Sequence, residues 1–353
     1  MRNADSRFFY GGYDGGRCRV YPRDWYTLDS RVVLLKGGAG TGKSTLMRAV
    51  LAQWQRQGRE TAAFFCGSDP ASLDAVCTAD RTRCVLDATA PHAVEARFPA
   101  AVERIVDLGS GLSRPLLRER LPELAVSAEE QRALRQSAGE KLRIAAETAR
   151  RECALTGEGV SAALLTRCAA RLSGQLFGRE RGREGERRAY LSGVTPDGML
   201  CLYETMTALC PRIFVLEGAA GAAQRLMQLL RQRAAQAGLL TVACPCALRP
   251  ECIEHLLLPA VGAAVTTSGP FHSVDFPVYR RLYLPRYRTE PLSAAARHER
   301  ERLTAVRGQL CTEAAAFLRA ARQRHQREEE LYGSAMDWAV ADALTEEVCR
   351  FLA

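Results

Sequence analysis

Short apolar runs alternate with an amphipathic stretch in the first hundred residues. The uniformly apolar runs are Val32–Leu35, Ala62–Phe65 and Cys84–Leu86. Such continuous runs are typical of strands buried on both faces of a parallel sheet. Between the first two runs, apolar side chains recur at helical spacing at Leu46, Val50, Leu51 and Trp54. The order strand, helix, strand predicts βαβ units with right-handed crossovers.

The same order of elements recurs in the second half of the chain. The first copy begins RVVLLKGGAGTGKSTLMRAVLAQW at Arg31, and the second begins RIFVLEGAAGAAQRLMQLLRQRAA at Arg212. After one deletion, Cys66 matches Cys246. A repeat of this length predicts two similar domains.

Each half also ends in a polar stretch that is predicted to form two helices. The predicted helices are Ser127–Cys153, Ser161–Leu176, Ser293–Glu330 and Ala335–Leu352. Many charges and few periodic large apolar residues favour extended helical hairpins over core helices. Between the halves, the charged, glycine-bearing segment Gly178–Arg188 predicts a linker.

The turn after the first apolar run has the sequence of a phosphate-binding loop. Gly37–Ser44 reads GGAGTGKS, matches GxxxxGK[ST], and lies between a predicted strand and a predicted helix. We expect Lys43 to bridge the β- and γ-phosphates and the Ser44 hydroxyl to bind Mg²⁺. The predicted nucleotide-binding residues are Gly37, Gly38, Ala39, Gly40, Thr41, Gly42, Lys43, Ser44 and Thr45.

Acidic residues that end predicted strands are the candidates to complete this site. Asp87 ends the run CVLD and is predicted to hold Mg²⁺ and to act in catalysis with Lys43; the alternative is an Asp that caps a loop. Asp69, in CGSD, is the second catalytic candidate, although turn chemistry alone would also put an Asp before a Pro. His92 is a candidate for contact with the γ-phosphate or the other half, or is purely structural.

The matching turn of the second half has lost the residues that this chemistry needs. Gln224 stands at the position of the lysine, Arg225 at that of the serine, and Ala223 at that of the last glycine. We therefore expect the second half to bind Mg·NTP poorly and to serve as a structural or regulatory partner. Arg225 could still hold an anion, and Arg225 or Arg249 could reach the γ-phosphate of the first half as an arginine finger.

These patterns together define the predicted architecture. The fold class is α/β, with two tandem P-loop NTPase-like domains that have parallel sheets, each followed by a helical hairpin. Domain 1 is assigned to residues 1–178, with the intact loop, and domain 2 to residues 179–353, with the degenerate one.

Composition indicates which nucleotide the protein is expected to bind and in which compartment it is expected to occur. The only lysines are Lys36, Lys43 and Lys141, and none lies in the [NT]KxD motif that a Ras-type GTPase needs, so ATP with Mg²⁺ is the expected cofactor. The formal net charge is +9, but basic and acidic residues are interleaved, which favours codon bias in a GC-rich genome over nucleic-acid binding as the reason for the many arginines. Thirteen cysteines occur singly and are expected to be free, mostly buried thiols. No segment has the apolar length of a membrane span, so a cytoplasmic protein is expected.

The chain resembles a bacterial family of tandem P-loop ATPases of unassigned function. In the first half the resemblance rests on KGGAGTGKST, FFCGSDPASLDAV and VLDATAPH, and in the second on TPDG, CPCALRPECIEHLLLP and EELYGSAMDWAVADALTEEV. It implies a duplicated NTP-binding fold and supplies no substrate. The family usually has an intact loop in each half, so the altered second loop departs from it.

The leading hypothesis is an ATPase in which domain 1 binds and hydrolyses the nucleotide and domain 2 is a non-binding half. One alternative is a small-molecule or nucleotide kinase with an arginine-rich lid. The other is a nucleotide-gated module whose basic helical arms contact a protein or nucleic acid, with little hydrolysis.

Overall fold

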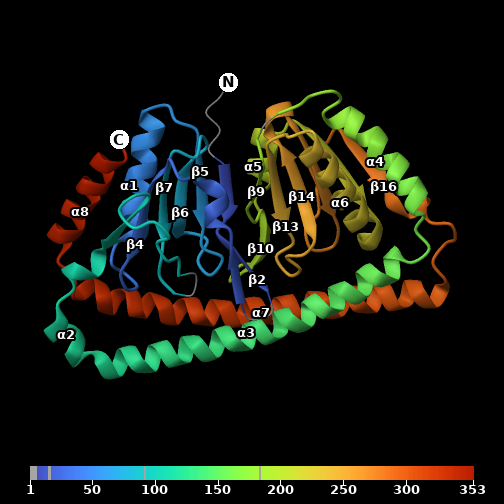
Figure 1. The fold of residues 1–353 in the computed structure, drawn as a ribbon. Helices are drawn as coiled ribbons and strands as arrows, with labels where there is room; N and C mark the ends of the chain where they lie inside the picture. The colour runs from blue at the N-terminus through green and yellow to red at the C-terminus, as the bar shows by residue number, and fades with distance from the viewer. Residues whose placement is uncertain (1–5, 15–16, 91–92, 183) are drawn as a thin grey trace.

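The computed structural model describes residues 6–14, 17–90, 93–182 and 184–353. His92 lies outside the described residues. The protein is an α/β protein in which two six-stranded sheets stand side by side above a pair of long helices (Figure 1).

The first sheet is mixed rather than parallel. In order across the sheet, its strands are β1 (Ser6–Phe9), β5 (Thr61–Phe65), β6 (Leu73–Thr78), β7 (Arg83–Asp87), β4 (Arg31–Lys36) and β8 (Glu103–Asp107). Strand β6, which the sequence patterns did not predict, runs antiparallel to both of its neighbours. The connections on either side of β6 are only 66–72 and 79–82, and a parallel crossover needs a dozen or more residues.

The second sheet repeats the first strand for strand. Its order is β9 (Glu186–Arg188), β13 (Thr241–Pro245), β14 (Ile253–Leu258), β15 (Ala263–Ser268), β12 (Arg212–Glu217) and β16 (Arg280–Tyr283). Here β14 is the antiparallel strand. Small hairpins follow the edge strands: β2 (Gly11–Asp14) with β3 (Arg17–Val20), and β10 (Ser192–Thr195) with β11 (Gly198–Cys201). The predicted duplication of strands is thus confirmed, and the prediction of parallel sheets is wrong for one strand in each.

Eight α-helices accompany the sheets in the described part of the chain. They are α1 (Lys43–Arg56), α2 (Arg114–Glu119), α3 (Leu121–Gly157), α4 (Ala162–Leu176), α5 (Tyr203–Leu209), α6 (Ala220–Gln236), α7 (Ala294–Ser334) and α8 (Trp338–Phe351). Short 3₁₀ turns lie at Pro22–Trp25, Leu108–Gly111, Pro259–Val261 and Leu284–Tyr287. None of these described helices combines the length and the apolar character that a bilayer crossing requires.

The two halves exchange their helical arms. Helices α3 and α7 pack against each other in opposite directions across both sheets (Figure 1), with Ser127 bonded to the Arg324 carbonyl at one end and Thr304 to Glu152 at the other. Helix α4 of the first half then packs on α6 of the second, and α8 of the second half packs on α1 of the first. The prediction of a helical hairpin within each half is therefore wrong.

Apolar side chains explain the exchange. Val348 and Leu352 at the C-terminus are buried in the core that contains Trp54 of α1, and the Trp54 indole donates to the Leu352 carbonyl at 3.2 Å. Leu165 and Leu172 of α4 are likewise buried in the core beneath α6. Each half thus completes its hydrophobic core with residues from the other.

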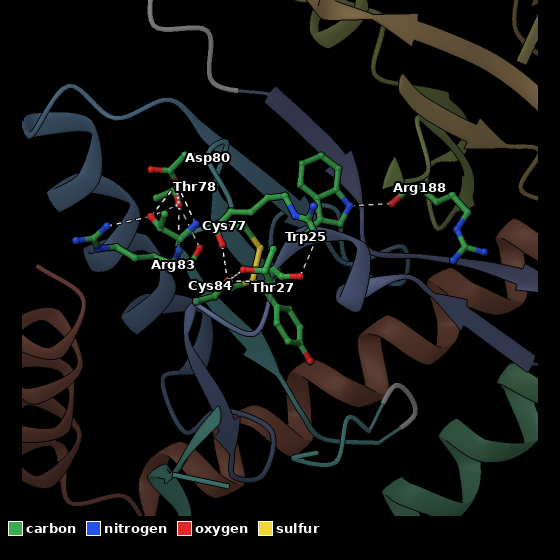
Figure 2. The surroundings of a disulfide bond; sticks show 12 residues. Trp25, Thr27, Cys77, Thr78, Asp80, Arg83, Cys84 and Arg188 are labelled. Carbon is green, nitrogen blue, oxygen red and sulfur yellow. Dashed lines mark hydrogen bonds between the residues drawn. A yellow bond between two sulfur atoms is a disulfide. The ribbon is translucent and has the colours of Figure 1, made fainter. Parts of the chain in front are cut away.

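A further core lies between the two sheets. It contains Phe8, Trp25 and Phe64 from the first half and Leu191 and Leu257 from the second. At its edge the Trp25 indole donates to the Arg188 carbonyl at 2.8 Å (Figure 2). The two halves therefore form one continuously packed molecule.

Cysteine pairing departs from expectation at one place. Cys77 on β6 and Cys84 on β7 form a disulfide between adjacent strands, where free thiols were expected (Figure 2). The other eleven cysteines, all within the described residues, are half-buried or buried thiols that form no disulfide, as predicted.

Candidate functional site

The segment between β4 and α1 forms a glycine-rich loop that ends at the start of a helix. Gly40 has φ +66° and Gly42 has φ +89°, conformations that residues with a side chain rarely adopt. Helix α1 begins at Lys43, and no side chain caps its first turn. The N–H groups of such a turn lack intrahelical partners and, with the helix dipole, favour an anion.

Lys43 is held inside this loop. Its ammonium donates to the carbonyls of Gly37 and Gly38 at 3.1 and 2.7 Å and lies 3.7 Å from Oδ2 of Asp87. Both charged side chains are only about one-tenth exposed, Lys43 12% and Asp87 11%. The predicted Lys43 and Asp87 are therefore brought together.

Asp87 and Ser44 are fixed by neighbouring backbone. Asp87 ends β7, which pairs in parallel with β4, and its Oδ1 accepts from the N–H and hydroxyl of Thr89 at 2.8 and 2.5 Å. Ser44 Oγ accepts from the N–H of Leu73 at 3.0 Å. The serine hydroxyl is thereby attached to the beginning of β6.

A buried carboxyl that the sequence analysis missed lies beside them. Asp74 is the second residue of β6 and is 6% exposed. Burial, and next the negative charge of Asp87, raise the pKa of Asp74 from 3.8 to about 7. A carboxyl inside the apolar run LDAVCT was the available signal, but it was overlooked because β6 itself was not predicted.

Asp69, the other predicted acid, lies at the rim. It accepts from the Ser72 hydroxyl at 2.6 Å, which is ordinary turn chemistry. Its Oδ1 lies 4.0 Å from a guanidinium nitrogen of Arg322 on α7. Asp69 is thus farther from the loop lysine than Asp87 but faces a cation from the other half of the chain.

A cavity of about 620 Å³ covers the loop, and both halves build its walls. The arm helices contribute Gln131, Arg135, Arg322, His325, Glu328 and Glu329, and α8 contributes Trp338. The end of α7 lies against the loop so closely that a Cβ on Gly40 would be 2.4 Å from the Glu329 carbonyl oxygen. Sequence reasoning missed these residues because they lie far from the loop along the chain.

The arginines near the loop are not those that the sequence favoured. Arg135 and Arg322 line the loop cavity, whereas Arg249 lines a cavity in the second half and Arg225 an exposed groove there. The expectation that Arg225 or Arg249 reaches the γ-phosphate of the first half is therefore wrong for this structure. The arm exchange is the cause, because it brings α7, not α6, over the loop.

The residues present fit a phosphate-anchored Mg²⁺. Among the described residues no cluster of three or more His, Cys, Asp or Glu side chains forms a metal site of its own. Mg²⁺ commonly binds through one or two carboxylates, phosphate oxygens and waters. Ser44, Asp87 and Asp74 supply such a set of oxygens beside the loop.

In the second half a helix replaces the loop. Helix α6 begins at Ala220, four positions before Gln224, which matches the first residue of α1. Its first turn is covered by the end of α3, because the N–H of Gly221 donates to the Thr156 hydroxyl at 3.0 Å. The side-chain oxygen of Gln224 accepts a hydrogen bond from the Cys153 thiol at 2.8 Å. Thr267 stands on β15 where Asp87 stands on β7.

Comparison with known proteins gives one local similarity. The family model described as Nephrocystin 3, N-terminal, matches residues 21–97, a stretch that contains β4, the loop, α1 and strands β5 to β7. No curated protein and no solved structure matches the chain. The match covers less than a quarter of the chain and names a different family from the tandem P-loop ATPases, whose resemblance stays a prediction.

Proposed function

We propose that the protein binds Mg·ATP at residues 37–45 and hydrolyses it, with the second half as a partner that binds no nucleotide. The observation that supports this most strongly is the uncapped start of α1 behind a glycine loop that holds Lys43 beside a buried Asp87. The loop N–H groups, the helix dipole and the ammonium all favour phosphate oxygens at one point.

The chain's own groups then have separate tasks. Lys43, which in the described state donates to two loop carbonyls, exchanges these for phosphate oxygens. When bound, Mg²⁺ neutralises charge on the transferred phosphoryl group. Ser44 and Asp87 would hold it, and Asp74 or Asp69 would orient the attacking water. Hydrolysis by such a site rests on positioning and electrostatics rather than on covalent chemistry.

The geometry of the second half supports its role as the non-binding partner. Thr156 occupies the anion-binding start of α6, and neither a lysine nor an acid takes the places of Lys43 and Asp87. One site per chain follows. The test is turnover of γ-labelled ATP by the full chain with and without a panel of acceptors, in which label in inorganic phosphate supports hydrolysis and label in an acceptor supports the kinase alternative.

One contact favours the nucleotide-gated alternative as a second candidate. The end of α7 lies so close to the loop that an added Cβ would be 3.2 Å from the Tyr332 ring at Gly38 and 2.4 Å from the Glu329 carbonyl oxygen at Gly40, so phosphate entry is expected to shift the arm. Slow turnover with a large nucleotide-dependent change in protein or nucleic-acid binding by the arms would support this candidate.

Arg322 is expected to contact the γ-phosphate. It lines the loop cavity and now faces Asp69 and Asp197, at 4.0 and 3.4 Å. Arg322→Ala should weaken ATP binding about tenfold, since a hydrogen bond to a charged group is worth about 1.5 kcal/mol or more, and should leave ADP binding nearly unchanged. Calorimetry with both nucleotides measures this. Arg319→Ala, one turn earlier and exposed, is the control, and equal loss of ATP and ADP affinity would contradict a γ-phosphate contact.

Asp74 should make stability depend on pH. Its pKa is about 7 in the folded protein and near 3.9 when unfolded, so between these values the folded state keeps a proton that the unfolded state releases. Stability from this group is therefore present at pH 4 and is lost as the pH rises to 7. Asp74→Asn should be more stable than wild type by an amount that grows across this range to at most about 4 kcal/mol. Urea unfolding at each pH measures it, and a difference independent of pH would refute the shift.

A further inference from the structure

The second half contains a cavity of about 530 Å³ that the nucleotide proposal does not use. It lies at the carboxyl ends of β12 and β15, where Leu216 and Thr267 line it, and at the beginning of β14. In an open α/β sheet this end is where ligands bind. The volume is in the range of small-molecule sites, about 300–1,000 Å³.

Two half-buried arginines with incomplete hydrogen bonding line this cavity. Arg249 and Arg307 each have a buried Nε atom without a hydrogen-bond partner. A buried unsatisfied donor is costly, about 1–3 kcal/mol, and the donors of a guanidinium need oxygen acceptors. Arg307 is held in place from two sides, by Glu152 at 3.0 Å and by the Phe271 ring, whose centroid is 3.9 Å from its guanidinium carbon.

Two of the three acids that line the cavity face cations. Glu152 forms an ion pair with Arg307, although its Oε2 atom, like the two Nε atoms, has no hydrogen-bond partner. Glu254, whose side chain is 13% exposed, accepts from the Ser192 hydroxyl and lies 3.5 and 3.7 Å from the imidazoles of His255 and His272. Arg249 and Arg300 remain on the wall, and the exposed Glu301 is the only other acid there. With Glu254 set against the two imidazoles and Glu301 against one arginine, one guanidinium charge is left over, which favours a ligand that carries a negative charge.

The rest of the wall is largely apolar. Met199, Ala220, Leu248, Ile253 and Phe271 belong to it. An apolar wall with a few convergent polar groups is the usual composition of a small-molecule site. We propose that this cavity binds a small organic anion, a carboxylate or a phosphate monoester with an apolar body, whose acidic group is bound by Arg249 and Arg307.

The test is a calorimetric titration of the full chain with phenylacetate and phenyl phosphate, which represent the two anion types, and with neutral phenylacetamide. We expect saturable binding of at least one anion, one per chain, and at least tenfold weaker binding of the amide. Arg249→Met should weaken anion binding tenfold or more, and Arg302→Met, on an exposed α7 residue paired with Glu299, should leave it unchanged.

A second variant tests the cavity independently, in case Arg249→Met loses binding only because it fails to fold. Ala220→Phe fills the cavity from the first turn of α6 and leaves every arginine in place, so it should also abolish binding. Lys43→Ala should bind the anions as wild type does, which separates this site from the nucleotide loop. The proposal is overturned if neither anion binds saturably in the millimolar range, if the amide binds equally well, if Ala220→Phe binds normally, or if Lys43→Ala loses the anion.

Discussion

Lys43→Ala should weaken binding of Mg·ATP by about 3 kcal/mol, the upper value for a hydrogen bond to a charged group, or about 10²-fold in Kd. The ammonium is the one cation inside the loop in the described structure and is only 12% exposed; it donates to two loop carbonyls and lies 3.7 Å from Asp87. Phosphate oxygens are stronger acceptors for it than neutral carbonyls, because the bond is then charged on both sides.

Calorimetry on the full chain gives both affinity and stoichiometry. Wild type should bind one Mg·ATP per chain. Lys141→Ala is a matched control, because Lys141 lies on α3 and pairs with Glu313 at 2.6 Å, away from the loop. Two equivalent sites per chain would contradict a second half that binds no nucleotide, and an unchanged Kd in Lys43→Ala would show that the glycine loop is not the nucleotide site.

Asp87→Asn should lower turnover about 10²-fold or more, the scale seen when one preorganised electrostatic group is removed, and change the Kd for ATP little. Asparagine keeps an oxygen that can accept from Thr89, as Oδ1 of Asp87 does at 2.8 Å, so the end of β7 should stay in place. What is lost is the negative charge 3.7 Å from Lys43, which is the charge that would hold Mg²⁺.

The neighbouring acids provide the comparison. Asp74→Asn and Asp69→Asn remove carboxyls that line the same cavity. Initial rates and Kd values for all three variants, measured over a range of Mg²⁺ concentrations, separate metal binding from water positioning. If Asp87→Asn hydrolyses ATP at the wild-type rate, Asp87 does not hold the metal, and whichever of the other two variants is slow takes that role.

The sequence by itself determined the local frame of the candidate site. The run Val32–Leu35, the motif at 37–44 and the helical spacing from Leu46 to Trp54 predicted strand, loop and helix, and the structure has them in that order. These elements follow from short-range physics: apolar continuity sets the strand, glycine permits the positive φ angles, and periodic apolar residues set the helix. The repeat likewise predicted that the strands occur twice.

Only the tertiary structure decided what surrounds that frame. Strand β6 escaped prediction because Asp74 interrupts its apolar run and its turns are short. Without β6 the sheet was predicted to be parallel, whereas the antiparallel β6 makes it mixed. The arms were predicted as hairpins from their many charges and few periodic large apolar residues, and such a pattern does not say which helix will pack against which. Their exchange brings Arg322, hundreds of residues away in sequence, over the loop. It also places the Thr156 hydroxyl against the first turn of α6. Such long-range pairings depend on how whole surfaces fit together, and no local pattern of residues encodes them.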